Sequence, residues 1–336
     1  MIATEVVKAL AVGLQHRRNF LLVGPPGVGK TAIMDQVAEK TGHDIITFIA
    51  VTSDRTEIGG FPWIYNTENG VKAEKVPIGD LAKLFTATKP TIACFDDIGQ
   101  APDSVQASLM QLWWSGKVGG RKISDHVKFL GATNRRQDKA GVTRIIEPFK
   151  SRLTIINLET DVNAWDLWAS EHNMPIELRA AILADPEMLY FHEPTNEIAN
   201  SRTPRTIAEC GKILQEGYPD ELLFEMLAGT AGETFAHYFI GFRDAYMSGQ
   251  LPKMKEIYEA PDMAKLPERL DLQYLVCLSL AKNATQTNFE ATLKYLRRLP
   301  TAYSTFAVLE ALKLNPAISN TEAFSTWAVD NQEALN

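Results

Sequence analysis

The segment Gly24-Pro25-Pro26-Gly27-Val28-Gly29-Lys30-Thr31 fits the pattern G-x-x-x-x-G-K-[ST]. A short apolar run, Asn19–Val23, precedes it, and Ala32–Lys40 follows with the apolar spacing of a helix. Strand, loop and helix in this order are the context that a phosphate-binding loop requires. Glycines let successive N–H groups turn toward one phosphate, and the helix N-terminus adds the positive end of its dipole. The pattern therefore predicts an α/β fold that binds a nucleotide.

The side chains of the motif have distinct expected roles. Lys30 would bring a point charge to the β- and γ-phosphates, and Thr31 would hold Mg²⁺. An ordinary glycine-rich turn between a strand and a helix is the alternative interpretation. The residues that we expect to contact the nucleotide are Gly24, Pro25, Gly27, Val28, Gly29, Lys30 and Thr31.

The composition is typical of a globular protein of two or three domains, with 336 residues of which 45% are hydrophobic and 22% charged. No stretch approaches about 18 uncharged apolar residues, and the N-terminus lacks the order of a signal peptide. We therefore expect a cytoplasmic protein with no membrane partner. Cys94, Cys210 and Cys277 are expected to be buried thiols. The net charge of −7 argues against a protein that coats nucleic acid.

The sequence changes character near residue 159. Before it, β-rich apolar runs alternate with helical patterns, which predicts a parallel sheet covered by helices. The expected strands are Phe20–Val23, Ile45–Val51, Thr91–Phe95, Val127–Gly131 and Leu153–Leu158. After it, the chain is predicted to be all-helical, and several helices are expected to open with a proline, at Pro175, Pro204, Pro219, Pro267 and Pro300. We expect domains at 1–158, 159–250 and 251–336, with a linker around Leu251–Lys265.

A β-hairpin is predicted between the second and third strands. Trp63–Asn66 and Val71–Val76 flank Asn69-Gly70, a strong signal for a hairpin turn. We expect this hairpin to project from the sheet, with the loop Gly59–Trp63 before it. A solvent-exposed excursion without a role is the alternative.

Two acids end the third predicted strand, Thr91–Phe95. At the carboxyl end of a buried strand beside a phosphate loop, one acid can coordinate Mg²⁺ and the next can orient or deprotonate the attacking water. We assign Asp96 to the metal and Asp97 to the water. The alternative is that the two acids cap the helix expected at Ala101–Trp114.

At this point the chain resembles an AAA+ ATPase, and its details resemble the MoxR branch. Besides the phosphate loop and the inserted hairpin, Asp96-Asp97-Ile98-Gly99-Gln100-Ala101-Pro102 is similar to that branch's D-E-I-N-R-A-P. The resemblance covers roughly residues 10–215. It implies a P-loop core with a helical lid, and a ring, usually a hexamer, with ATP at each subunit junction. Hydrolysis would remodel a protein client, and a metal-binding adaptor protein is a frequent partner.

Three further residues take roles from the resemblance. Asn134, at the end of Phe129–Asn134, is similar to sensor 1 and would position the water; a turn asparagine is the alternative. Arg152 resembles the arginine finger that reaches a neighbouring subunit, with Arg144 as a poorer candidate and a solvated surface pair as the alternative. Arg205 resembles sensor 2 and would contact the γ-phosphate from the first turn of a lid helix, or would be an exposed helical arginine.

Two features depart from the family pattern. The family usually has glutamate where this chain has Asp97, whose side chain is one methylene shorter, so we expect slow turnover. The helical C-terminal extension after about residue 230 does not map onto the family, and we interpret it as a client-specific or ring-bracing module.

Other classes of function stay open. An ATP-gated binding scaffold with little turnover is one alternative. A nucleic-acid-associated AAA+ motor is another, because the Gly60–Trp63 loop and the hairpin lysines, Lys72 and Lys75, could grip a peptide or a single strand. A small-molecule kinase would share the loop but act as a monomer. The six histidines are scattered and give no metal-hydrolase pattern.

Overall fold

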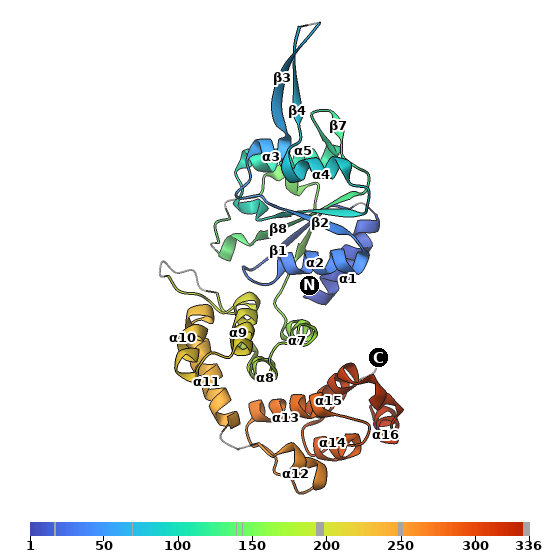
Figure 1. Cartoon of the computed structure of the whole chain (residues 1–336), viewed down its shortest axis with the longest axis vertical. Helices are drawn as coiled ribbons and strands as arrows, with labels where there is room; N and C mark the ends of the chain where they lie inside the picture. The colour runs from blue at the N-terminus through green and yellow to red at the C-terminus, as the bar shows by residue number, and fades with distance from the viewer. Residues whose placement is uncertain are drawn as a thin grey trace. The chain divides into compact units, whose positions relative to one another are not determined.

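The computed structural model describes residues 1–16, 18–68, 70–138, 140–142, 144–192, 198–247 and 251–331 (Figure 1). Asn69, the first residue of the predicted Asn-Gly turn, lies outside the described residues. The contacts within the chain divide it into two units. The first is Met1–Ala164 with His192–Glu197 and Thr203–Arg205, and the second is Trp165–Phe191, Ile198–Arg202 and Thr206–Asn336.

A five-stranded parallel sheet forms the centre of the first unit (Figure 1). In spatial order its strands are β2 (Asp44–Ile49), β5 (Thr91–Asp96), β8 (Val127–Asn134), β1 (Phe20–Gly24) and β9 (Thr154–Asn157). All neighbouring pairs run parallel, so the carboxyl ends of the strands meet at one edge. The predicted parallel sheet is confirmed, with each strand within a few residues of its expected range.

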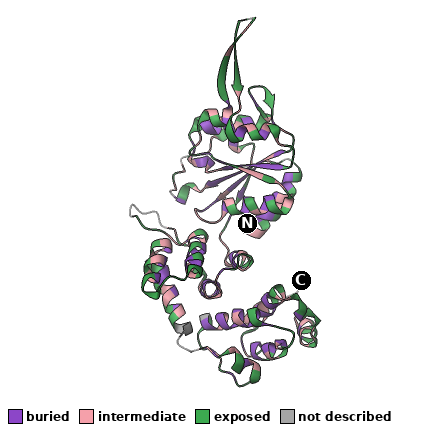
Figure 2. Cartoon of the chain, viewed as in Figure 1, coloured by how far each residue is buried: buried purple, intermediate pink, exposed green. Residues whose placement is uncertain are grey.

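Helices cover both faces of this sheet because its strands alternate their side chains. Leu22 packs with α1 (Ala3–Gln15) and α2 (Lys30–Thr41) in one core cluster. Leu21, its neighbour, belongs to the opposite cluster with α3 (Arg55–Gly59), α4 (Gly79–Thr86) and α5 (Asp103–Ser115). The three central strands, β1, β5 and β8, are therefore buried on both sides, and they are largely purple in Figure 2. Such two-sided burial explains why they appear in the sequence as continuous apolar runs.

The predicted hairpin is confirmed as a separate two-stranded sheet of β3 (Phe61–Thr67) and β4 (Gly70–Val76). The prediction that Gly59–Trp63 is a loop is wrong, because β3 already begins at Phe61. Gly60 alone makes the turn, with φ +83°, a conformation that favours glycine. The sequence analysis also missed α3, although Asp54 and Glu57 form a capping box at its start.

Short elements complete the first unit. They are the small antiparallel sheet of β6 (Lys117–Val118) and β7 (Arg121–Lys122), the 3₁₀ helices η1 (Ile98–Gln100) and η2 (Arg136–Asp138), and α6 (Glu147–Lys150).

The second unit is helical. Its helices are α7 (Val162–Glu171), α8 (Ile176–Ala184), η3 (Pro186–Met188), α9 (Pro204–Glu216), α10 (Asp220–Ala231), α11 (Glu233–Met247), α12 (Met254–Glu259), α13 (Leu270–Asn283), α14 (Phe289–Leu296), α15 (Thr301–Leu314), η4 (Pro316–Asn320) and α16 (Glu322–Asp330). Proline precedes or begins α8, α9, α10 and α15, as predicted. The prediction for Pro267 is wrong, because α13 begins only at Leu270, after Arg269 as its N-cap.

The segment Leu251–Lys265, predicted as a linker, is instead part of a packed core. It contains α12, and Ile257 and Ala264 are buried with residues of α13, α14 and α15. Its proline and lysine content suggested a linker, but the apolar residues between them decide its structure. The cysteines are free and buried, as predicted. Among the described residues, no helix is both long and apolar enough to span a membrane.

A buried ionic triad ties three helices of the second unit together. Arg179 of α8 donates to Asp166 of α7 at 2.7 and 2.9 Å and to Glu310 of α15 at 2.9 Å. Ser170 also donates to Glu310, at 2.8 Å. Burial disfavours the charged guanidinium, but the two carboxylates outweigh burial and raise the pKa of Arg179. The lid helices predicted at 159–250 are thus bonded to a helix of the predicted extension.

We expect Arg179→Ala to lower the free energy of unfolding of the helical unit by about 3–5 kcal/mol, because it leaves two buried carboxylates without a counter-charge. Urea unfolding followed by circular dichroism measures this loss. Lys212→Ala, which removes the exposed pair with Glu209, is the control and should change stability by less than about 0.5 kcal/mol. Equal effects of the two substitutions would contradict the importance of the triad.

Candidate functional site

The loop between β1 and α2 has the backbone geometry that its glycines predict. Gly27 has φ +71°, and Gly29, the N-cap of α2, has φ +96°. A Cβ atom on Gly27 would lie 2.4 Å from the Thr203 hydroxyl, so a larger residue would meet both strain and a clash. The loop therefore ends directly on a helix N-terminus, an arrangement suited to an anion.

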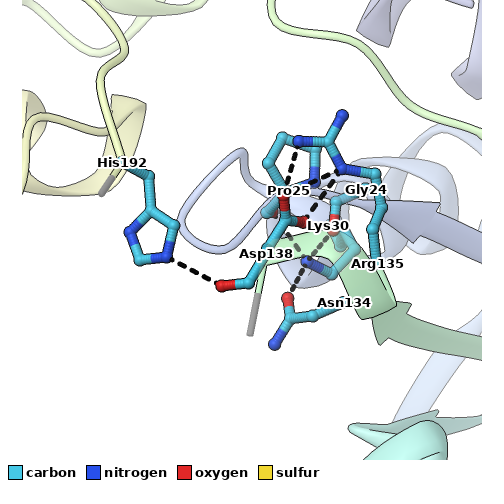
Figure 3. Close-up of polar contacts among 7 residues, drawn as sticks. All are labelled: Gly24, Pro25, Lys30, Asn134, Arg135, Asp138 and His192. Carbon is cyan, nitrogen blue, oxygen red and sulfur yellow. Dashed lines mark hydrogen bonds and ion pairs between the residues drawn. The ribbon is translucent and has the colours of Figure 1, made fainter. Parts of the chain in front are cut away.

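Lys30 lies at the centre of the site and is only 7% exposed. Its ammonium donates to Gly24 O at 3.1 Å, to Pro25 O at 2.9 Å and to Asn134 Oδ1 at 2.6 Å (Figure 3). Burial lowers the pKa of Lys30 from 10.5 to about 8, although the charges of Asp96 and Asp97 oppose this shift.

The structure brings Thr31 and Asp96 together. The Thr31 hydroxyl donates to Asp96 Oδ2 at 2.5 Å, joining the start of α2 to the end of β5. A hydroxyl and one carboxylate oxygen are suitable ligands for Mg²⁺, which typically keeps several waters and takes the rest of its ligands from phosphates. No cluster of three or more acidic, histidine or cysteine side chains suited to a metal occurs in the described ranges. The residues thus fit a magnesium ion that arrives with a nucleotide.

Asp97 adopts a left-handed backbone conformation, with φ +56°. Its N–H donates to Asp96 Oδ1 at 2.9 Å, and its own Oδ1 accepts from Gln100 Nε2 at 2.7 Å. Burial, and after it the Asp96 charge, raise the pKa of Asp97. The alternative that the two acids cap the next helix is wrong, because the N-cap of α5 is Pro102.

Asn134 reaches the site because β8 lies next to β1. The register pairs Asn134 with Gly24, so the side chain at the end of β8 lies beside the first residue of the loop. There it accepts the shortest hydrogen bond of Lys30. A turn asparagine without partners would not be bonded in this way.

Arg205 lies near the loop through its backbone. Its N–H donates to Gly27 O at 3.1 Å, and its side chain is exposed at the start of α9. Its positive charge contributes to the lowered pKa of Lys30 and acts against the raised pKa of Asp97. The guanidinium therefore acts on the site electrostatically.

The two remaining arginines are not part of this cluster. Arg152 donates from Nη1 to Pro148 O, and its guanidinium lies 5.1 Å from the ring centre of Trp114. Arg144 forms an ion pair with Asp103 at the start of α5.

The sequence analysis missed one charged pair beside the loop. Arg135 donates to Asp138 at 2.7 and 2.9 Å, and His192 Nε2 lies 3.3 Å from Asp138 O (Figure 3). The buried Asp138 carboxylate acts to raise the pKa of Lys30. Only the three-residue spacing of opposite charges after Asn134 could have indicated it.

Fold and site together define a P-loop nucleotide-binding protein. In agreement, residues 19–153 match the family model described as the AAA domain (dynein-related subfamily). The chain thus contains an AAA domain and has AAA+ ATPase relatives.

Two curated relatives illustrate the similarity. A proteasome-activating nucleotidase from Methanocaldococcus jannaschii is 30% identical over 135 residues, covering 37% of this chain and 28% of that protein. A 26S proteasome regulatory subunit 6B homolog from Dictyostelium discoideum is 31% identical over 127 residues, covering 37% and 30%. The match therefore spans less than a third of either relative.

A solved structure of the Thermotoga maritima RuvB Holliday junction branch migration motor is 15% identical. The alignment covers 98% of this chain and 86% of that one with a TM-score of 0.40. The fold assignment rests on the sheet order given above and not on this likeness.

We expect the binding of Mg-ATP at pH 8 to take up about half a proton, because phosphate oxygens favour the charged form of Lys30, whose pKa is about 8 beforehand. Affinity should accordingly fall as the pH rises above 8, where the free protein loses this charge. Calorimetry in buffers of different ionisation enthalpy measures the uptake. At pH 6.5 Lys30 is already protonated and the uptake should vanish; a binding enthalpy independent of buffer at pH 8 would contradict the prediction.

Proposed function

We propose that the chain is a MoxR-like AAA+ ATPase that assembles into a ring, a hexamer as is usual in that branch. This ring would remodel or activate a protein client, with a metal-binding adaptor protein as a candidate partner. The observation that carries this proposal is the bonded set of Lys30, Thr31, Asp96 and Asn134 around a glycine loop. These are the groups that a triphosphate and its metal ion need.

In this proposal the loop residues bind Mg-ATP. Backbone N–H groups from Gly27 to Thr31 would surround the phosphates, and Lys30 would exchange its carbonyl partners for phosphate oxygens. Thr31 and Asp96 would hold the magnesium ion, which neutralises charge on the phosphates when it is bound. The existing 2.5 Å contact between these two side chains supports a shared ligand, since it brings both oxygens to one point.

Asp97 and Asn134 would handle the attacking water. The raised pKa of Asp97 makes its carboxylate a better proton acceptor than an exposed aspartate, which partly offsets the shorter side chain. Asn134 would orient the water with the amide that now contacts Lys30. Activity should therefore rise with pH as Asp97 loses its proton.

Arg152 and Arg205 would stabilise the transition state from outside the loop. Arg205 would turn toward the γ-phosphate from the start of α9, while Arg152 would act on the nucleotide of a neighbouring subunit. Residues 159–250 would serve as the lid, and 251–336 as a client-specific or ring-bracing module.

The hairpin of β3 and β4 is the part we propose to contact the client. It exposes Phe61, Trp63, Ile64 and Val71, an unusual set of large apolar side chains on a solvated two-stranded sheet. Lys72 and Lys75 lie on β4 beside them. The net charge of −7 favours a peptide over a nucleic acid as the bound chain.

We expect Asp97→Asn to lower ATP turnover by at least about 10²-fold while ATP binding persists, because the amide cannot accept the proton of the water. Lys30→Ala should lose binding as well, and Asp80→Asn, at an exposed position of α4, should change neither. A coupled phosphate-release assay and nucleotide titration give the two quantities. Wild-type turnover in Asp97→Asn would show that the base is misassigned, and negligible turnover of the wild type itself would favour the ATP-gated scaffold.

Client capture tests the remaining part of the proposal. With ATP bound, the Asp97→Asn protein should elute as a ring in size-exclusion chromatography with light scattering, and cross-linking should trap the client. Adding Trp63→Ala should abolish trapping and leave the ring intact, since the change is confined to the exposed hairpin. Full activity as a monomer would instead support the kinase alternative, and trapping unaffected by Trp63→Ala would remove the hairpin from client binding.

A further inference from the structure

The register of the sheet separates Arg152 from the phosphate loop of its own chain. β1 and β9 run parallel, with Phe20 opposite Thr154 and Val23 opposite Asn157. The loop follows the carboxyl end of β1, whereas Arg152 precedes the amino end of β9. Four to five residues of strand, at about 3.3 Å each, put roughly 15 Å between these two edges. An Arg152 that acts on a γ-phosphate must therefore act on one held by another copy of the chain.

Helix α5 connects the same two edges. It begins with Asp103, shortly after Asp96 at the carboxyl edge, and ends at Ser115. At this end Trp113 is buried and packs edge-on against Phe149 of α6, with ring centres 5.2 Å apart. The next residue, Trp114, points outward because consecutive helical side chains diverge by about 100°. It is 73% exposed.

The exposed ring of Trp114 lies against Arg152. The guanidinium carbon is 5.1 Å from the ring centre, and Nη1 donates to Pro148 O in α6. A cation over an aromatic face is held by the ring without giving up a hydrogen-bond donor to it. Within the described ranges, all hydrogen bonds of this guanidinium come from Nη1.

In the part of the chain that the structure describes, Arg152 contacts neutral groups: the Trp114 ring, Pro148 O and the Ser151 hydroxyl, whose Oγ lies 3.4 Å from Nη1. Two other arginines of the same unit are paired with carboxylates. Arg144 is paired with Asp103, and Arg135 with Asp138. Among the described residues, no carboxylate lies within ion-pair distance of Arg152. Its full positive charge is therefore available to a phosphate, while an aromatic face and a carbonyl restrict its orientation.

We propose that Trp114 is a positioning residue that holds Arg152 ready for the nucleotide of the adjacent subunit; this inference rests on the proposed function. A long exposed arginine samples many rotamers, and ordering it costs entropy when the transition state forms. Stacking on Trp114 removes part of this cost in advance. An exposed tryptophan at the end of α5 thereby gains a role that burial cannot explain.

The first test compares turnover with binding. Trp114→Ala should lower kcat about two- to fivefold, the effect of one exposed cation–π contact. Nucleotide affinity and the mass of the assembly should stay unchanged, because Arg152 acts in the transition state. Trp114→Phe keeps an aromatic face and should restore most of the loss, and Trp114→Ala should cause no further loss in an Arg152→Ala background. A loss of kcat that follows only a loss of assembly mass, or that persists without Arg152, would overturn the inference.

The second test mixes subunits. Arg152→Ala keeps an intact phosphate loop and Lys30→Ala keeps an intact Arg152, so each should be inactive alone, and their mixture should regain activity. A double variant, Lys30→Ala with Trp114→Ala, used as the arginine donor should reduce the regained activity about two- to fivefold, the same loss that is expected for Trp114→Ala alone. Equal recovery with the Lys30→Ala donor and with the double variant would overturn the role of Trp114 and leave that of Arg152 intact.

The mixing experiment distinguishes the role of Trp114 from the action of Arg152 on a neighbouring subunit. Wild-type turnover in Arg152→Ala, or assembled mixtures that regain nothing, would reject the arginine in trans and with it this part of the proposed function. Thermal unfolding of each variant checks the fold, and Trp114→Phe provides a conservative replacement should the alanine variant be unstable.

Discussion

The hydrogen bond between the Lys30 ammonium and the Asn134 amide joins the phosphate loop to the neighbouring strand. It exists because β8 lies between β1 and β5 and pairs Asn134 with Gly24. The same strand order places β1 and β5 on either side of β8, so the phosphate loop after β1 and Asp96 at the end of β5 lie at the same edge of the sheet. The other contacts of the site, including the Thr31–Asp96 bond, follow from this arrangement of three parallel strand ends.

The site holds two ionisable side chains, Lys30 and Asp97, in partly buried positions where their charged forms are less well solvated than in water. Burial lowers the pKa of Lys30 and raises that of Asp97, although each lies near charges that act the other way. Both shifts disfavour the charged forms of these side chains, the Lys30 ammonium that would bind phosphate and the Asp97 carboxylate that would accept a proton from water. A cluster of aromatic rings behind the site, with Phe95, Trp113 and Phe129 in mutual contact, stabilises the sheet that holds these groups. Function here depends on stability supplied by the adjacent core.

Much of the first unit could be predicted from local sequence, because its three central strands are buried on both faces and its loop has a fixed pattern. The positions of Asp96 and Asn134 could be predicted as strand ends, and parallel strands bring such ends together. The contact between Arg152 and Trp114 could not be predicted, because the two residues are far apart in the sequence and only the packing of α5 on α6 brings them together. Leu251–Lys265 was misassigned for a related reason: the burial of Ile257 depends on helices that follow it.

The buried triad of Arg179, Asp166 and Glu310 has a consequence for how the helical unit can change during evolution or engineering. A chain shortened before α15 would lose Glu310, which leaves Arg179 with Asp166 as its carboxylate partner and removes the acceptor of the Ser170 hydroxyl. Transferring α7 and α8 into a related protein would require a carboxylate in the place of Glu310 as well. Replacing α15 alone would therefore break the ion pair between Arg179 and Glu310, so this helix can be exchanged only together with the helices that it packs on.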